Sequence, residues 1–296
     1  MKKRIHLIAA KPDDLPQKFW SQTVPEFAEA ELINVDLNLE TLRPQWKEIL
    51  KFSDGIIVDR ANSSNILQLI NGVPRRITEI QCLDSVFKDK KGNWWSECFY
   101  REILHESIVA AADNLDTSAS AYITGEGAFM RIGMSVLVQL GYRKINLVLE
   151  RIENSDALSD VFKRLYFDTE FNFLPNMDLT LQKNDGTILI NTASLVDHQE
   201  LKEDLTYLNF IFGAGLVVDT QSDQVSNPVM DEALHVGLRV LFGHALQARA
   251  DWKILSRMLG PLKISLQEFE QKWFEYVQQS VSVEKLAEGP VTKGSD

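Results

Sequence analysis

Short apolar runs alternate with longer amphipathic stretches along most of the chain. In the first part, apolar runs at residues 5–8, 32–35 and 55–58 are separated by stretches long enough for helices, and residues 42–52 repeat their apolar positions with helical spacing. Strands that alternate with helices form parallel sheets, because each helix carries the chain back to the start of the next strand. The pattern therefore predicts a β-α-β-α-β unit at the start of the chain.

A different pattern follows. Two strand-like runs, residues 82–87 and 94–99, flank residues 88–93, whose sequence is KDKKGN. Lysine, aspartate, glycine and asparagine are poor strand formers, so this segment predicts a β-hairpin. A helix is expected from about residue 101 to 112, and the polar stretch 113–118 suits a connection between domains.

The alternation resumes after this connection. The expected strands are residues 119–124, 144–149, 187–190, 216–218 and 238–242. The expected helices are residues 129–140, 156–165, 231–235, 246–259 and 266–277. The order predicts a second α/β domain followed by two long helices, with a loose polar tail over residues 280–296.

Length and composition agree with two folded domains. The chain has 296 residues, of which 45% are hydrophobic, and this excludes intrinsic disorder and a disulfide-stapled miniprotein. Its 31 basic and 42 acidic residues give a net charge of −11, so we expect no nucleic acid partner. No apolar run approaches the roughly 20 residues of a membrane helix, and residues 5–10 are too short for a signal peptide. We therefore expect no membrane association and a cytoplasmic location.

The cysteines and histidines suggest no metal or disulfide chemistry. Cys82 and Cys98 flank the expected hairpin and could lie opposite each other, but two half-buried free thiols are the favoured interpretation. The five histidines show no i, i+4 pairing and no cysteine lies near them, so a zinc site is not expected.

One loop suggests a ligand. Residues 121–124 lead directly into Gly125-Glu126-Gly127, and a helix containing Gly133 follows. This arrangement of strand, Gly-x-Gly and helix places a dinucleotide pyrophosphate at the helix N-terminus. The first glycine permits the tight turn, and the second lets a phosphate approach the backbone.

The same loop departs from a standard cradle. Glu126 puts a carboxylate beside the expected pyrophosphate, and Ala128 and Phe129 replace the small residues that usually follow. Phe129 could crowd the cradle. A turn that is kept only for folding, with Glu126 solvated, therefore competes with the cofactor interpretation.

The end of the next strand bears on the choice of cofactor. Glu150 follows roughly 20–25 residues after the glycine turn, the distance of an acid that hydrogen-bonds the ribose hydroxyls of NAD. Arg151 beside it could instead meet the 2′-phosphate of NADP. If a dinucleotide binds, NAD is favoured over NADP, and the site could also bind neither.

The order and spacing of the elements resemble the shikimate dehydrogenase family over residues 3–277. Residues 140–148 (LGYRKINLV) are similar to the segment that leads into the second strand of the family's nucleotide domain. Residues 189–194 (LINTAS) are similar to a later strand and its turn, and residues 217–219 (VVD) are similar to the strand after that turn. Single positions then match without a gap, namely Pro228, Ala233, Gly237, Gly243 and Gly260.

The resemblance implies an α/β fold with two domains. The N-terminal substrate-type α/β domain, which contains the hairpin, would comprise residues 1–112 and 244–279, because the C-terminal helices return to it. Residues 113–243 would form a Rossmann-like domain, and residues 280–296 a flexible tail. The cofactor-binding candidates from the glycine turn and the resemblance are Gly125, Glu126, Gly127, Ala128, Glu150, Arg151, Asn191 and Thr192.

The family's catalytic residues do not carry over. A lysine and an aspartate handle the proton of the oxidised hydroxyl in this family, and Ser63 and Tyr100 hold those positions here. The Ser-Lys-Ser segment that holds the substrate carboxylate is absent near residues 13–18. The glutamine of the C-terminal helix falls on Ala250, and a rival register with a gap places His244 there. A tyrosine, with a reference pKa of about 10, is a poor base.

Aromatic residues gather where the family's cleft opens. Trp94, Trp95, Phe99 and Tyr100 could bind an apolar ligand or another protein, although packing of the hairpin is the favoured interpretation.

We therefore expect a divergent, non-catalytic protein, a pseudoenzyme that binds a small-molecule ligand or a protein partner. The alternative is an active NAD(P)-dependent oxidoreductase that acts on a small hydroxy acid with altered specificity. An enzyme of another class in the same cleft is a third possibility, for which the sequence shows no set of residues.

Overall fold

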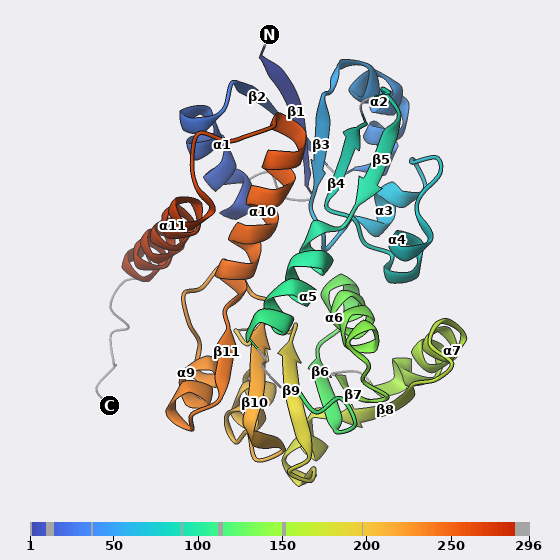
Figure 1. Ribbon diagram of the computed structural model, residues 1–296, viewed down its shortest axis with the longest axis vertical. Helices are drawn as coiled ribbons and strands as arrows, with labels where there is room; N and C mark the ends of the chain where they lie inside the picture. The colour runs from blue at the N-terminus through green and yellow to red at the C-terminus, as the bar shows by residue number, and fades with distance from the viewer. Residues whose placement is uncertain are drawn as a thin grey trace, which may run out of the picture.

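Two β-sheets organise the molecule, one from each half of the sequence (Figure 1). The computed structural model describes residues 2–9, 15–36, 38–89, 91–111, 115–149, 152–196 and 198–287.

The first sheet has the strand order β2-β1-β3-β4-β5. Its strands are β1 (Lys3–Ala9), β2 (Ala30–Asp36), β3 (Gly55–Val58), β4 (Ser85–Lys88) and β5 (Trp94–Glu97). Its helices are α1 (Leu15–Phe27), α2 (Leu39–Phe52), α3 (Ser64–Leu67) and α4 (Arg75–Ile80). The first three strands are parallel and the last two form an antiparallel hairpin, as the sequence predicts.

Helix α2 illustrates why these segments fold locally. Asn38 caps the helix, because its side-chain oxygen accepts a hydrogen bond from the backbone N–H of Glu40. Leu42, Trp46 and Ile49 are buried at intervals of three and four residues, so one face of the helix covers the sheet.

The second sheet is parallel throughout, with the order β11-β10-β9-β6-β7-β8. Its strands are β6 (Ser120–Thr124), β7 (Lys144–Leu149), β8 (Glu170–Pro175), β9 (Gly186–Asn191), β10 (Ile211–Asp219) and β11 (Arg239–Leu241). The helical segments are α6 (Gly127–Leu140), η1 (Ile152–Asn154), α7 (Ser155–Leu165), η2 (Asn176–Leu181), α8 (Gln199–Thr206) and α9 (Pro228–His235). This is the doubly wound arrangement of a Rossmann-like domain.

Three further helices join the two halves. Helix α5 (Phe99–Ala111) leads from the hairpin to the second sheet, and α10 (Gly243–Leu259) returns and packs against α5. Helix α11 (Leu266–Ala287) packs against α10 and α1, where Trp273 stacks on Phe19 with ring centroids 4.5 Å apart. The tail expected from residue 280 is therefore wrong in its first part, because α11 continues to Ala287. Residues 288–296 lie outside the described part of the chain.

The two domains share apolar packing. One cluster of buried side chains extends from Ile8 and Val58 in the first sheet to Ile123 and Val218 in the second. A polar contact reinforces this junction, since Arg131 Nε of α6 donates a hydrogen bond to the carbonyl of Ile80 at 2.8 Å. The shared core fixes the space between the two sheets.

Among the described helices, none combines the length and the apolar character needed to cross a lipid bilayer.

Candidate functional site

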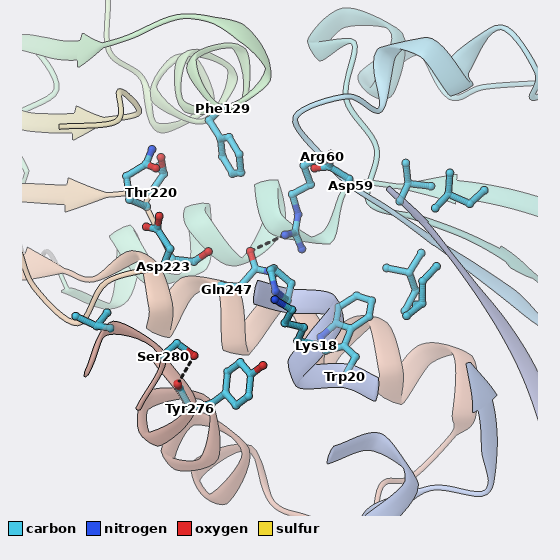
Figure 2. Close-up of a pocket in the computed structure, with 18 of the residues that line it drawn as sticks. Lys18, Trp20, Asp59, Arg60, Phe129, Thr220, Asp223, Gln247, Tyr276 and Ser280 are labelled. Carbon is cyan, nitrogen blue, oxygen red and sulfur yellow. Dashed lines mark hydrogen bonds between the residues drawn. The ribbon is translucent and has the colours of Figure 1, made fainter. Parts of the chain in front are cut away.

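A cleft of about 800 Å³ lies between the domains, where strands of both sheets end (Figure 2). Parallel sheets bind ligands at the carboxyl ends of their strands. The ends of β1 and β3 and the segment after β10 line the cleft, together with parts of α1, α6, α10 and α11. Phe129 and Tyr276 lie on opposite sides of it. Polar and apolar groups therefore mix in a space large enough for a small organic molecule.

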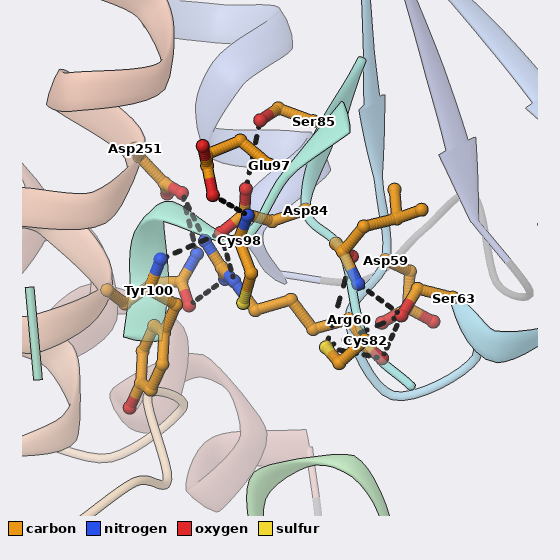
Figure 3. Close-up of polar contacts among 12 residues, drawn as sticks. Asp59, Arg60, Ser63, Cys82, Asp84, Ser85, Glu97, Cys98, Tyr100 and Asp251 are labelled. Atoms are coloured by element: carbon orange, nitrogen blue, oxygen red, sulfur yellow. Dashed lines mark hydrogen bonds and ion pairs between the residues drawn. The ribbon is translucent and has the colours of Figure 1, made fainter. Parts of the chain in front are cut away.

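Arg60 is the central charged group of the cleft. It follows β3, and its Nη1 donates a hydrogen bond to Oε1 of Gln247 at 2.7 Å. Its Nε lies 3.3 Å from Oδ2 of Asp84, and its Nη2 lies 3.5 Å from Oδ1 of Asp251 (Figure 3). Burial opposes the charge of Arg60, but the two carboxylates outweigh this effect and raise its pKa. Arg60 is therefore a permanent cation.

The two carboxylates are held from several directions. Asp84 accepts a hydrogen bond from the backbone N–H of Tyr100 at 2.8 Å. Asp251 accepts hydrogen bonds from Trp20 Nε1 at 2.9 Å and from Gln247 Nε2 at 2.7 Å. Burial raises the pKa of Asp84, and it raises the pKa of Asp251 to about 6, while Arg60 acts in the opposite direction. Arg60 is thus the shared counterion of two buried carboxylates.

Ser63, which the resemblance aligns with the family's lysine, makes contacts that stabilise the fold. Its side chain is fully buried, its Oγ donates to the carbonyl of Arg60 at 2.9 Å, and it accepts from the backbone N–H of Leu83 at 3.1 Å. These hydrogen bonds connect the turn after β3 with Leu83, which lies just before β4. Ser63 is not among the described residues that line the cleft.

Tyr100, at the position of the family's aspartate, is also buried. Its ring lies 4.8 Å from the guanidinium carbon of Arg60, and it meets the ring of Phe129 edge-on at 5.2 Å. Within the described residues its hydroxyl has no hydrogen-bond partner. Burial raises the pKa of Tyr100 above its usual value, so the hydroxyl stays protonated near neutral pH and cannot accept a proton from a ligand.

Phe129 does not crowd the glycine turn, and that expectation is wrong. Helix α6 turns its side chain into the interdomain cleft, where it packs on Tyr100. Ala128, the other residue expected to disturb the turn, is buried in the core at the start of the same helix.

The glycine turn keeps the backbone geometry of a phosphate cradle. Gly125 has φ +93°, and a Cβ there would lie 2.7 Å from Oγ1 of Thr192. Gly127 has φ +83°, and a Cβ there would meet nothing within 4 Å. A second hollow of about 410 Å³ lies beside the turn, and Glu126 and Ser194 help to line it. The backbone fits a dinucleotide phosphate, but the exposed carboxylate of Glu126 opposes its charge.

Asn191 and Thr192 mainly connect strands. Asn191 Nδ2 donates to Oδ1 of Asp219 at 3.0 Å, and its Oδ1 accepts from Thr124 Oγ1 at 2.6 Å. Thr192 Oγ1 donates to the carbonyl of Thr124 at 2.6 Å, and Thr192 also lines the second hollow. Burial raises the pKa of Asp219 to about 6. Of this pair, only Thr192 borders the space that a cofactor would use.

Two candidate residues fall outside the described part of the chain. Strand β7 ends at Leu149, and Glu150 and Arg151 follow it. The preference for NAD that rests on Glu150 therefore stays a prediction.

The C-terminal helix contributes a different residue from those expected. Ala250 is buried in the core, and His244 lies between the rings of Phe242 and Phe274, 5.5 Å from each. Gln247 is the residue of α10 that lines the cleft. Neither Ala250 nor His244 is among the described residues that line the cleft, so the position of the family's glutamine stays a prediction.

Two of the hairpin aromatic residues, Phe99 and Trp94, make their contacts within their own domain. Phe99 stacks on Phe87, and Trp94 lies under the ammonium of Lys88 at 4.7 Å. Trp95 is exposed, and its Nε1 donates to Asp89 at 3.1 Å. These contacts support the favoured interpretation of hairpin packing.

The cysteines are free, as predicted, but they are fully buried rather than half-buried. Burial, and then the neighbouring thiol of Cys82, raise the pKa of Cys98. Among the described residues, no group of three or more His, Cys, Asp and Glu side chains could hold a metal ion.

Solved structures of dehydrogenases share this fold. Shikimate 5-dehydrogenase from Thermus thermophilus, in complex with shikimate, matches with TM-score 0.68 and 16% identity over 95% of this chain and 99% of that chain. Quinate dehydrogenase from Corynebacterium glutamicum, in complex with NAD, matches with TM-score 0.71 and 13% identity over 93% and 99%. Shikimate 5-dehydrogenase from Listeria monocytogenes, in complex with shikimate and NAD, matches with TM-score 0.72 and 13% identity over 91% and 96%.

No protein-family model and no curated protein sequence matches the chain. The similarity therefore establishes the two-domain fold of shikimate and quinate dehydrogenases, with its Rossmann-like domain and C-terminal helices.

Proposed function

We propose that this protein binds a small ligand in the interdomain cleft and does not oxidise it. The observation that carries this proposal is the burial of Ser63 and Tyr100, the two side chains that the sequence resemblance assigns to the proton-transfer positions. Removal of a hydride from an alcohol requires a group that accepts the hydroxyl proton within hydrogen-bond reach.

The other acids near the cleft do not replace the missing base. Asp84 and Asp251 are 0% exposed, and both are held by Arg60 and by further hydrogen bonds. Asp59 lines the cleft, but its carboxylate accepts bonds from the backbone N–H of Ala61 and from Asn62 Nδ2. Asp223 also lines the cleft, but it is exposed, so a bound hydroxyl group would find no buried base free of hydrogen-bonded partners among the described residues.

Turnover measurements test this proposal. We expect no reduction of NAD or NADP at high protein concentration with shikimate or quinate as the substrate, followed by nicotinamide absorbance. Turnover that is abolished by Ser63→Ala or Tyr100→Phe would overturn the proposal, because those side chains would then take part in the chemistry.

An active oxidoreductase on a small hydroxy acid is the second candidate function. The backbone of the Gly125 turn supports it, since the turn leaves room for a phosphate at the N-terminus of α6. The solved dehydrogenases with NAD have the same fold. NAD is the favoured cofactor for this candidate, and turnover of a hydroxy acid with NAD separates it from the first proposal.

Glu126→Ala is expected to strengthen binding of NADH about fivefold, because it removes a like charge from beside the phosphates. The gain should shrink as salt is added, since screening acts over about 8–10 Å in ordinary buffers. Titration of NADH fluorescence at two ionic strengths measures both effects.

Glu48→Ala is the matched control, because Glu48 is an exposed acid on α2 in the other domain. If both variants bind NADH like the parent protein, Glu126 is not the obstacle at the turn.

A further inference from the structure

We infer that the interdomain cleft selects a neutral, polyhydroxylated ring and discriminates against carboxylic acids, because Asp84 and Asp251 already match the charge of Arg60. This inference rests on the proposed ligand-binding function and names the ligand class for the same cleft. Asp251 is the specificity-determining residue in this account, since it neutralises Arg60 without itself facing the ligand.

The contacts of Arg60 leave little of its charge for a ligand. Its Nε and Nη2 face Asp84 and Asp251 at 3.3 and 3.5 Å, and its Nη1 is bound to Gln247. Gln247, whose bond to Arg60 is drawn in Figure 2, in turn donates to Asp251, so the guanidinium is enclosed by a hydrogen-bonded set. An incoming carboxylate would have to compete with two acids that are already buried and in place.

The remaining charges of the cleft do not attract an anion. Lys18 is exposed, and it lies across the cleft from Asp223, which lines the opposite side (Figure 2). Asp59 adds a further acid at the end of β3. With Asp84 and Asp251 behind Arg60, the described acids around the cleft outnumber the bases, and this potential opposes a negatively charged ligand.

Neutral polar groups and aromatic faces make up much of the rest of the lining. Gln221, Ser222 and Gln279 offer amide and hydroxyl groups, which pair with ligand hydroxyls. Trp20, Phe129 and Tyr276 offer rings, whose faces pack against the C–H surface of a saturated ring. A cyclitol or a sugar presents both kinds of surface and carries no charge.

Calorimetric titration with myo-inositol and quinate tests the inference, because both are hydroxylated six-membered rings and only quinate carries a carboxylate. Glucose, titrated in parallel, distinguishes a sugar from a cyclitol as the source of the same chemistry. We expect the parent protein to bind one of the neutral rings at least tenfold more tightly than quinate. A change in tryptophan fluorescence that is lost in Trp20→Phe reports whether binding occurs in the cleft.

Asp251→Asn tests the cause. The change keeps one acceptor oxygen, which either Trp20 or Gln247 can use, and it removes the negative charge beside Arg60, so the affinity for quinate relative to the neutral ring should rise about tenfold or more. Asp84→Asn should act in the same direction through Nε of Arg60, and it keeps the test valid if the first variant does not fold. Asp168→Asn is the matched control: it removes the same charge at an exposed position that does not line the cleft, and it should change the ratio by no more than about threefold.

The outcomes are distinguishable. If quinate binds the parent protein more tightly than either neutral ring, the inference is overturned and the binding function stands. If Asp168→Asn gains as much as Asp251→Asn, Arg60 is not the source of selectivity and the inference is also overturned. If no ring binds the parent protein and neither Asp251→Asn nor Asp84→Asn gains quinate binding, the proposed binding function fails with it.

Discussion

Replacing Arg60 with methionine is expected to lower the free energy of unfolding by about 3–5 kcal/mol. The change leaves Asp84 and Asp251 without their shared counterion, and both side chains are 0% exposed. An uncompensated charge in a dry site costs far more than the ion pair contributes by itself. Urea denaturation at pH 7, followed by circular dichroism, measures the loss.

Arg76→Met is the matched control for this experiment. Arg76 pairs with Glu97, but more than half of its side chain is exposed, so its loss should cost no more than about 1 kcal/mol. The combined change of Arg60→Met with Asp84→Asn and Asp251→Asn should recover most of the stability, because it removes the buried charges together. Equal losses in Arg60→Met and Arg76→Met would show that the buried cluster carries no special electrostatic role.

Hydrophobic periodicity predicted most of the elements because their buried faces are regular. The β-α-β-α-β unit and the hairpin are clear examples, since the strands β1 and β3 are almost wholly buried. Helix α8 escaped prediction because only Leu201 and Leu205 are buried among its polar residues. Strand β8 escaped because it lies at the edge of its sheet, where one of its six residues is buried.

The charged cluster could not be predicted in the same way. Arg60, Asp84 and Asp251 lie far apart in the sequence, and only the return of α10 to the first domain brings them together. The sequence does place Arg60 just after the buried strand β3. That position alone does not predict a buried cation, because a single arginine after a strand is also typical of a surface loop. The direction in which a helical side chain points is also difficult to predict from the sequence. The sequence located Phe129 at the start of a helix, but the rotation of α6 decides that it faces the cleft.

Two buried carboxylates should make stability rise as the pH falls. The pKa of Asp219 and that of Asp251 are each about 6 in the folded protein, against 3.8 as the usual value. Because both values are raised, the folded state holds more protons than the unfolded state between pH 6 and pH 4. The stabilisation is therefore fully present below about pH 4 and is lost as the pH rises through 6.

Comparison with the variant Asp219→Asn/Asp251→Asn isolates this contribution. Each pKa unit corresponds to about 1.4 kcal/mol, so the change in stability from pH 7 to pH 5 should be about 2–3 kcal/mol more favourable in the parent protein than in the variant. Subtraction is needed because the pKa values of His6 and His244 are lowered by burial, which destabilises both proteins equally as the pH falls. Urea denaturation at the two pH values gives the four free energies. The same pH dependence in parent and variant would contradict this prediction. It would mean that the pKa values of the two carboxyl groups are the same in the folded and the unfolded chain, so that burial does not raise them.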